Sequence, residues 1–330
     1  MKRFARRTLV IFVIVGAAIF LLSLRAVPPS ISYGASFSPL YAQELGLDWR
    51  AVYGMMLDDL GVKHLRLSAY WPLVEPEQGR YSWEELDFQI REAKKHNADV
   101  ILAVGRRLPR WPECHVPKWA ERLPWPEQKK EIWNMVRAVV ERYRSDPAII
   151  MWQVENEPFL PVFANEHCGN TDKEFFVDEL ALVRTLDARP ILVTDGGNFG
   201  TWAEAYHAGD VFGTSVYLYF WNETTGIFRT ILPPAYYRVK TNLMRFLGVK
   251  PVILSELSLE PWLAASIHSV SLEDQLARMN ADTFDEVITY ARKTSFAMQY
   301  LWGVEWWYYM REHGHPEFWN RAKTLFNPPQ

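Results

Sequence analysis

The sequence predicts a single (β/α)8 TIM barrel preceded by an N-terminal transmembrane or signal-anchor helix. Three observations lead to this α/β fold class. Short apolar runs alternate with longer amphipathic segments eight times after residue 30, and such alternation is typical of a parallel sheet. The 330 residues suit one large domain, and eight such units close into a barrel of about 250 residues. No G-x-G-x-x-G or Walker A turn follows an early strand, which disfavours a doubly wound sheet.

Residues 1–30 are expected to form a basic stub, an apolar segment and a proline linker outside the barrel. The apolar run extends over residues 9–24, and Pro28-Pro29-Ser30 forms the linker. The run is as long as a long signal-peptide core or a short membrane span, and its cleavage pattern is poor. We therefore expect an uncleaved anchor, with cleavage and secretion as the alternative. Basic residues lie mainly before the run, which places the N-terminus inside the cell and the barrel outside: Lys2, Arg3, Arg6 and Arg7, against Arg25 after it.

The barrel is expected to occupy residues 31–330 without a second domain. Its predicted strands are short apolar runs between turn-forming residues: 31–37, 62–67, 100–104, 149–154, 191–194, 211–216, 252–255 and 296–301. A segment with apolar residues at helical spacing follows each strand: 49–60, 84–96, 126–144, 172–187, 202–208, 235–247, 272–293 and 316–325. Gly61 ends the first of these helices as a C-terminal cap.

The composition is that of an ordinary globular protein, with 49% hydrophobic and 23% charged residues. The net charge of −3 gives no indication of nucleic-acid binding, because nucleic-acid binders carry basic patches. The 15 tryptophans are many for this length. They fit either a well-filled core or stacking surfaces for sugar rings, and those that follow predicted strand ends favour the second interpretation.

The carboxyl ends of the eight strands face one rim of such a barrel, and that rim carries the active site. Glu157 follows the strand 149–154 within Asn156-Glu157-Pro158, and Glu256 ends the run 251–256 at the seventh strand. A carboxylate at the end of a buried strand is unfavourable unless it is hydrogen-bonded or takes part in chemistry. Strands four and seven lie on roughly opposing walls, so the two carboxylates can face each other. An ion pair with an arginine is the structural alternative for each of them.

These motifs resemble those of clan A glycoside hydrolases, (β/α)8-barrel enzymes that include cellulases, mannanases and β-galactosidases. Asn156-Glu157-Pro158 is similar to the clan signature at strand four, and 251–256 is similar to its nucleophile motif at strand seven. The stretch 71–87 resembles a clan pattern of the form W-x-x-x-E-P-x-x-G-x-Y-x-W-x-x-L-D. The resemblance covers most of the chain and identifies a clan rather than one substrate specificity.

The resemblance implies a retaining glycoside hydrolase that cleaves an oligo- or polysaccharide by double displacement. Glu157 is then the general acid/base and Glu256 the nucleophile, because glycoside hydrolysis needs one protonated and one ionised carboxyl group. Glu260 is the alternative nucleophile. Retention of configuration predicts that the two carboxyl groups are about 5 to 5.5 Å apart.

Four more residues match substrate-binding positions of the clan. Arg66 matches a strand-two arginine beside the nucleophile, and Asn156 matches an asparagine that binds the sugar 2-hydroxyl. Tyr217 matches, more loosely, a strand-six tyrosine that orients the nucleophile. Trp302 matches the strand-eight tryptophan that forms the floor of the subsite at the cleaved bond, with Trp306 as the alternative.

Cys114 and Cys168 lie in the loops after strands three and four, which are neighbours on the rim. We expect a disulfide between them in an exported chain, with a Cys/His metal site or two free thiols as alternatives. The run 312–315 lacks the H-E-x-x-H spacing of a zinc protease, and 213–217 lacks the last glycine of a nucleophile elbow. The sequence therefore predicts neither a metal site nor a serine hydrolase.

The sequence thus predicts an anchored or secreted glycoside hydrolase whose mechanism requires no cofactor. Its expected partners are a saccharide substrate and, through the N-terminal helix, a membrane. Two alternatives remain open: a barrel that binds carbohydrate without turnover, and a transglycosylase with the same residues. The sugar, the linkage and the choice between endo and exo cleavage depend on the loops after the strands.

Overall fold

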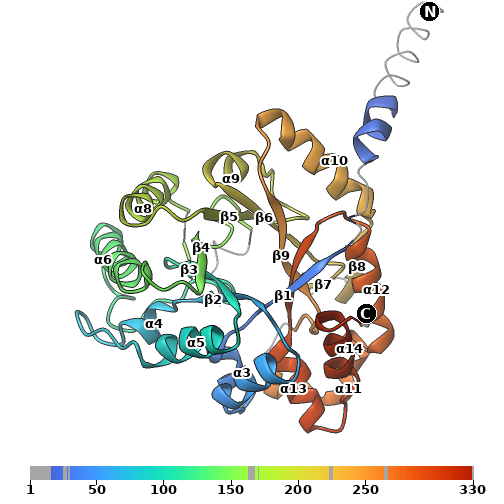
Figure 1. The fold of residues 1–330 in the computed structure, drawn as a ribbon, viewed down its shortest axis with the longest axis horizontal. Coiled ribbons are helices and arrows are strands. Elements are labelled where there is room, and N and C mark those ends of the chain that lie inside the picture. The colour runs from blue at the N-terminus through green and yellow to red at the C-terminus, as the bar shows by residue number, and fades with distance from the viewer. Residues whose placement is uncertain are drawn as a thin grey trace, which may run out of the picture.

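The computed structural model describes residues 16–24, 28, 30–162, 168–169, 171–222, 226–263 and 267–328. Figure 1 shows a ring of strands surrounded by helices. Eight strands, all parallel to their neighbours, form a closed barrel in the order β1-β10-β9-β6-β5-β4-β3-β2. Their bounds are β1 Ser32–Ser36, β2 His64–Ser68, β3 Asp99–Val104, β4 Ile149–Val154, β5 Ile191–Asp195, β6 Val211–Val216, β9 Val252–Ser258 and β10 Met298–Trp302.

The predicted barrel is confirmed, and each predicted strand has a counterpart in the structure. The strands are easily recognised in the sequence because each has one face inside the barrel and the other under the helices, which makes them nearly continuous apolar runs. The main helices also lie where helical spacing predicts them: α3 Trp49–Asp58, α5 Glu84–Lys95, α6 Trp125–Tyr143, α8 Lys173–Leu186, α9 Ala203–Ala208, α10 Pro234–Met244 and α14 Glu317–Phe326.

Three features of the structure differ from the prediction. The expected helix 272–293 is two helices, α11 Leu272–Arg278 and α12 Ala281–Arg292, because the Asn280 side chain accepts a hydrogen bond from the N–H of Thr283 and starts a new helix. The helix α13 Val304–Glu312 follows β10 directly. Strands β7 Tyr219–Asn222 and β8 Gly226–Arg229 form a hairpin after β6. Short helices also occur in the loops: α2 Pro39–Glu44, α4 Trp71–Val74, η1 Arg245–Leu247 and η2 Ile267–Ser269.

Side chains fill the barrel interior. Ile101, Leu192, Val211 and Tyr300 form a buried cluster made only of strand residues, as expected for the layers inside such a barrel. A larger cluster joins the outer faces of the strands to the helices. Several tryptophans belong to the fully buried core: Trp71, Trp152, Trp202, Trp306, Trp307 and Trp319. Core filling therefore accounts for these tryptophans, and the alternative role of Trp306 in a sugar subsite is wrong.

Among the described residues, no helix combines the length and apolar character needed to cross a bilayer. Residues 16–23 are helical, whereas residues 1–15, 25–27 and 29 lie outside the described part of the chain. The expected apolar run 9–24 is thus described only in its second half, and the membrane anchor stays a prediction.

Candidate active site

Directly after the carboxyl end of β4, the backbone adopts an unusual conformation at two glutamates. Glu155 and Glu157 have φ angles of 55° and 45°, a conformation that residues other than glycine rarely adopt. The N–H of Asn156 donates to the carbonyl oxygen of Arg107 at 2.6 Å, and the N–H of Glu157 donates to Thr194 Oγ1 at 2.9 Å. The neighbouring β3 loop and strand β5 therefore hold this unusual backbone in place.

Glu155 supports the rim of the barrel. Its two carboxylate oxygens accept hydrogen bonds from the backbone N–H groups of Arg106 and Arg107, at 2.7 and 2.5 Å. Burial raises the pKa of this carboxyl, and the two backbone donors act in the opposite direction. Since both oxygens bind the loop after β3, Glu155 has a structural role and Glu157 is the residue of β4 that can serve the site.

Arg66 joins the two sides of the candidate site. Its guanidinium is buried and donates through Nη1 to Glu256 Oε1 at 2.6 Å and through Nη2 to Asn156 Oδ1 at 2.8 Å. Its Nε donates to Gln153 Oε1 at 2.8 Å. One planar cation on β2 thus links the ends of β4 and β9, and Asn156, which it contacts, directly precedes Glu157.

Glu256 lies at the carboxyl side of β9 and is 4% exposed. Besides the Arg66 contact at Oε1, its Oε2 accepts a hydrogen bond from the hydroxyl of Tyr217 at 2.9 Å. Two donors suit an ionised carboxylate, which can only accept. Burial, and next the charge of Glu256, raise the pKa of Tyr217 well above its ordinary value, so its hydroxyl keeps the proton that it donates.

Glu157 is also buried, but its carboxyl group has other partners and neighbouring charges than that of Glu256. The hydroxyl of Ser215 donates to its Oε1 at 3.1 Å. Burial raises the pKa of Glu157 well above its ordinary value, and the negative charges of Glu256 and Glu113 raise it further, whereas Arg107 opposes the shift. The site therefore holds one carboxyl group that favours its protonated form and another that is bound by an arginine.

Trp302 borders the same site at the carboxyl end of β10. Its indole Nε1 donates to Glu260 Oε1 at 2.8 Å, and the same oxygen accepts from Arg110 Nη1 at 2.6 Å. A small cavity at this rim is lined by Arg110, Trp302 and Arg66, together with Ser36, Tyr70 and Glu305. Glu260 is thus paired with Arg110 and Trp302, whereas Glu256 is paired with Arg66 and Tyr217.

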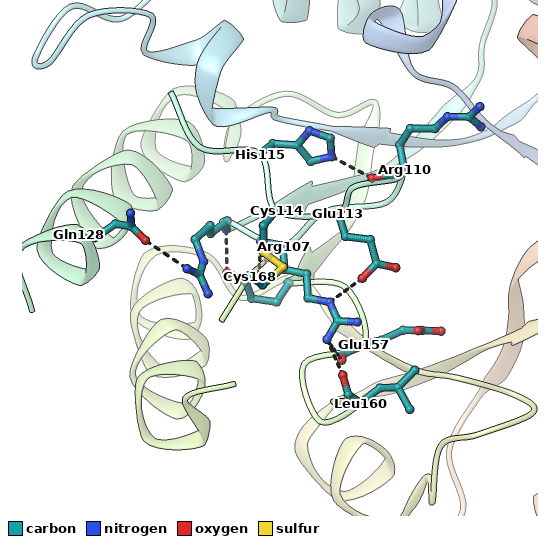
Figure 2. Close-up of a disulfide and its surroundings, with 11 residues drawn as sticks. Arg107, Arg110, Glu113, Cys114, His115, Gln128, Glu157, Leu160 and Cys168 are labelled. Carbon is teal, nitrogen blue, oxygen red and sulfur yellow. Dashed lines mark hydrogen bonds and ion pairs between the residues drawn. A yellow bond between two sulfur atoms is a disulfide. The ribbon is translucent and has the colours of Figure 1, made fainter. Parts of the chain in front are cut away.

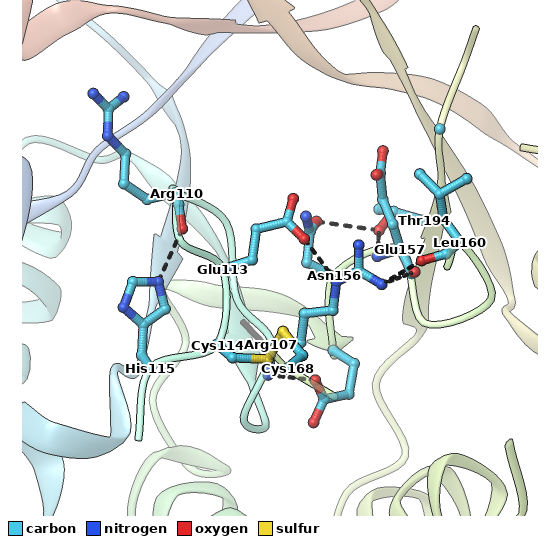
Figure 3. Close-up of polar contacts among 12 residues, drawn as sticks. Arg107, Arg110, Glu113, Cys114, His115, Asn156, Glu157, Leu160, Cys168 and Thr194 are labelled. Atoms are coloured by element: carbon cyan, nitrogen blue, oxygen red, sulfur yellow. Dashed lines mark hydrogen bonds and ion pairs between the residues drawn. A yellow bond between two sulfur atoms is a disulfide. The ribbon is translucent and has the colours of Figure 1, made fainter. Parts of the chain in front are cut away.

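The loop after β3 brings a third carboxylate that the sequence pattern does not reveal. Arg107 Nε donates to Glu113 Oε2 at 2.7 Å, while its Nη1 donates to the carbonyl oxygens of Glu157 and Leu160 at 2.7 and 2.8 Å (Figure 2). Figure 3 shows this guanidinium between Glu113 and the loop that carries Glu157. Burial raises the pKa of Glu113, and Arg107 opposes the shift. Glu113 therefore belongs to the electrostatic environment of Glu157.

The expected disulfide is confirmed. Cys114 and Cys168 are bonded, with their Cα atoms 5.3 Å apart, and link the loops after β3 and β4 (Figure 2). His115 contacts the carbonyl oxygen of Arg110 through Nε2 at 3.0 Å. The described residues contain no cluster of three or more His, Cys, Asp or Glu side chains that could hold a metal ion. The alternatives of a Cys/His metal site and of two free thiols are therefore wrong for these cysteines.

The structure brings the predicted residues together on one rim. Arg66, Asn156, Glu256 and Tyr217 share a single network of contacts, which Glu157 joins through its backbone N–H and the hydroxyl of Thr194. Trp302 lines a cavity that Arg66 also lines. The network places a carboxyl group with a raised pKa, a second carboxylate that accepts from an arginine and a tyrosine, and an asparagine amide at the carboxyl ends of barrel strands. This arrangement and fold define a clan A glycoside hydrolase, the class that the sequence motifs resemble.

The chain belongs to glycoside hydrolase family 42, whose family model, described as Beta-galactosidase, matches residues 48–247. Curated relatives have the same description. Beta-galactosidase BgaB of a Geobacillus species is 25% identical over 204 residues, which cover 55% of this chain and 28% of the relative. A beta-galactosidase of an Arthrobacter species is 24% identical over 225 residues, which cover 62% of this chain and 28% of the relative. The match thus spans less than a third of these relatives.

Solved structures share the fold at low sequence identity. The GH5_18 protein of Bifidobacterium longum superimposes with a TM-score of 0.58 at 14% identity, covering 82% of this chain and 69% of that structure. A cold-adapted beta-galactosidase from Rahnella sp. R3 superimposes with a TM-score of 0.55 at 15% identity, covering 92% of this chain and 56% of that structure. These similarities support the barrel architecture.

Proposed function

We propose that this protein is a retaining glycoside hydrolase that cleaves β-galactosides by double displacement. The observation that carries this proposal is the contrast between the two glutamates: Glu256 accepts from Arg66 and Tyr217, whereas burial and nearby negative charge raise the pKa of Glu157 well above its ordinary value. The family and the curated relatives supply the substrate class, since both are described as beta-galactosidases. An oligo- or polysaccharide with a terminal or internal galactosyl unit is the expected substrate.

In the first step, the carboxyl group of Glu157 donates its proton to the glycosidic oxygen as the bond to the anomeric carbon breaks. A carboxylate oxygen of Glu256 forms a bond to that carbon, and the leaving sugar departs as an alcohol. The product is a glycosyl ester of Glu256, and Glu157 is left as a carboxylate. Arg66 and Tyr217 orient the attacking oxygen, and Asn156 is available to bind a sugar hydroxyl.

In the second step, the carboxylate of Glu157 removes a proton from water while the water oxygen bonds to the anomeric carbon. The ester bond to Glu256 breaks, which releases the sugar and restores both side chains to their starting forms. Every proton is exchanged between substrate, water and Glu157. This chemistry requires no cofactor, and the indole of Trp302, at the carboxyl end of β10, is available to stack against the sugar ring.

A Glu157→Gln variant tests the assignment of the acid. Loss of general acid catalysis is expected to lower kcat/KM, which reports the first step, about 10²- to 10⁴-fold on galactosides with poor leaving groups, and much less on aryl galactosides whose leaving group needs no proton. Glu84→Gln, at an exposed position on α5, is the matched control and should retain full activity. Equal losses on both substrate types would show that Glu157 does not protonate the leaving group.

The wild-type protein should be assayed on aryl glycosides of several sugars. Turnover of β-galactosides above all others supports the proposed substrate, whereas turnover of another glycoside alone would contradict it. A complete lack of turnover would favour a carbohydrate-binding barrel. Product analysis with an added sugar acceptor distinguishes hydrolysis from transglycosylation, because a transglycosylase would transfer the glycosyl group to the acceptor rather than to water.

For its cellular location, we propose that the N-terminal segment anchors the protein in a membrane with the catalytic barrel outside the cytoplasm. The apolar run 9–24, the four basic residues before it and the disulfide of the barrel support this location. Flotation of the full chain with lipid vesicles tests the anchor, since a protein without an anchor stays at the bottom of the gradient.

A further inference from the structure

An apolar patch is exposed where α10 ends and η1 begins. We call it the α10 patch, and it consists of Leu243, Phe246, Leu247 and Val249, which are 43%, 80%, 55% and 80% exposed. Single exposed apolar residues are common on proteins, but four within seven positions form a continuous apolar surface. Such a surface calls for a partner that removes it from water.

The patch lies on the face of the barrel opposite the catalytic rim. It precedes β9 in the sequence, and Glu256 lies further along that strand. Because the barrel strands are parallel, the chain enters all of them on one face and leaves on the other, where the site is built. β1 also begins on the entry face, so the N-terminal segment reaches the barrel on the same side as the patch.

The N-terminal helix of residues 16–23 is bound beside α10 (Figure 1). Arg238 Nε donates to the carbonyl oxygen of Ser23 at 2.8 Å, and Asn242 Nδ2 donates to that of Leu22 at 2.6 Å. Arg238, Asn242 and Phe246 follow one another at four-residue spacing, so they share one side of the helical segment. The helix carries exposed apolar side chains of its own: Ile19, Phe20 and Leu21. The N-terminal segment and the α10 patch therefore flank the same helical segment, and both present exposed apolar side chains.

The charge of this region suits an anionic lipid surface. The segment 238–250 contains no acidic residue. Of its four basic residues, Arg238, Lys240 and Lys250 donate to carbonyl oxygens of neighbouring segments, which leaves Arg245 to face the solvent. Arg245 is exposed between the apolar residues of the patch. Basic side chains beside exposed Phe, Leu and Val are typical of segments that lie in the interface of a membrane, where headgroups meet acyl chains.

We propose that the α10 patch inserts into the surface of the lipid bilayer beside the N-terminal segment and holds the barrel with its catalytic rim facing away from the membrane. The inference rests on the proposed anchor and adds a second contact to it. A single flexible tether would let the barrel tumble, whereas two contacts on the entry face fix its orientation. The substrate would then reach the site from the aqueous side, without competition from the bilayer.

The test uses the full chain in vesicles of phosphatidylcholine and phosphatidylglycerol. A polarity-sensitive fluorophore is attached to the cysteine of Phe246→Cys, while Cys114 and Cys168 stay in their disulfide. The matched control is Ile231→Cys, an equally apolar and 96% exposed position before α10, near the opposite end of the same helix. We expect a blue-shifted emission at position 246 that lipid-attached quenchers suppress, and a water-like, unquenched emission at position 231.

Flotation of the same samples separates the two proposals. A chain that floats while both probes report water would overturn the patch and leave the anchor intact. A chain that does not float contradicts both. Efficient cross-linking between two copies at position 246, at low protein density in the vesicles, would overturn the lipid contact in favour of a second copy. Ser substitutions at Phe246 and Val249 should leave hydrolysis of a soluble aryl glycoside unchanged, because the patch lies far from the rim.

Discussion

The proposed mechanism needs a protonated Glu157, and the surroundings of this residue raise its pKa. Burial is the largest cause of its raised pKa, and Glu256 and Glu113 are the next. Of these, Glu113 can be changed without removing a reacting group. Arg107 joins it to the backbone of Glu157, with one contact at 2.7 Å to the carboxylate of Glu113 and another at 2.7 Å to the carbonyl oxygen of Glu157.

We predict that Glu113→Gln shifts the alkaline limb of the kcat/KM profile to lower pH. A general acid must be protonated, so activity is lost as the pH rises through its pKa. Removing the charge of Glu113 lowers the pKa of Glu157, which brings that loss to lower pH. The pH profiles of wild type and variant on one galactoside with a poor leaving group provide the measurement, and Glu121→Gln, exposed in the same connection between β3 and α6, is the control. An unchanged limb would mean that Glu113 does not act on Glu157.

Stability should respond in the opposite direction to activity at Glu157. Its pKa in the folded protein is raised, so the unfolded state loses its proton first and the folded state becomes relatively less stable as the pH rises above about 4.3, the usual value for Glu. Glutamine carries no such penalty. We therefore predict that Glu157→Gln raises Tm, with a gain that grows from pH 4 to pH 7, as thermal unfolding at several pH values can measure. A Tm that is equal to or below that of wild type at pH 7 would contradict the proposed electrostatic strain.

The loops after β3 and β4 act together as one element. The disulfide links Cys114 to Cys168, 54 residues later, and Glu113 directly precedes the first of these cysteines. A cross-link that closes a loop of this length stabilises a protein by about 4 kcal/mol in the chain-entropy model. Replacing both cysteines by alanine should therefore lower the stability by about 2 to 4 kcal/mol.

The same double variant should also lose activity well below its unfolding temperature. The disulfide holds Glu113 and the Glu157 loop in register, so its loss is expected to lower kcat and to shift the alkaline limb as Glu113→Gln does. Urea unfolding and a pH profile at 20 °C measure the two effects separately. A variant that is less stable but has an unchanged pH profile would limit the disulfide to a structural role.

The elements that could be predicted from the sequence are those with strong local patterns. Buried parallel strands are apolar along their whole length, and long helices repeat apolar residues at their own spacing, so strand β4 and helix α6 lie within a residue or two of their predicted bounds. The start of α12 was missed because a single side chain, Asn280, decides it. The hairpin of β7 and β8 was missed because its pairing depends on contacts outside the barrel sheet.

The residues of the candidate site show the same distinction between those with a local sequence pattern and those without one. Glu157 and Glu256 could be proposed because each follows an apolar strand, and the resemblance of Asn156-Glu157-Pro158 to the clan signature selects Glu157 over Glu155. Glu113 could not, since a glutamate in a long loop has no pattern that shows where it points. The role of Glu155 was equally hidden: Gly105 has a φ of +124°, and a Cβ at that position would lie 2.5 Å from Glu155 Oε1. The carboxylate of Glu155 occupies the space that a side chain at position 105 would need. Residue spacing along the sequence does not reveal this contact between the ends of two strands.

At the scale of the whole molecule, the two faces of the barrel differ in the side chains that they expose. The rim at the strand ends gathers the carboxylates and Trp302, whereas the entry face carries the N-terminal segment and the α10 patch. The matched region spans 28% of the beta-galactosidases from Geobacillus and Arthrobacter. The family model matches residues 48–247, a range that includes Arg66, Glu157 and Tyr217 and ends before Glu256.

The central claim is that Glu256 forms a covalent bond to the sugar while Glu157 handles the proton. A 2-fluoro-galactoside with a good leaving group slows the second step and traps the glycosyl-enzyme, which mass spectrometry of the digested protein can locate. We predict that the added mass is found on Glu256, in one copy per chain, and that Glu256→Gln abolishes it. Label on Glu260, or turnover by the protein without any trapped intermediate, would contradict the claim.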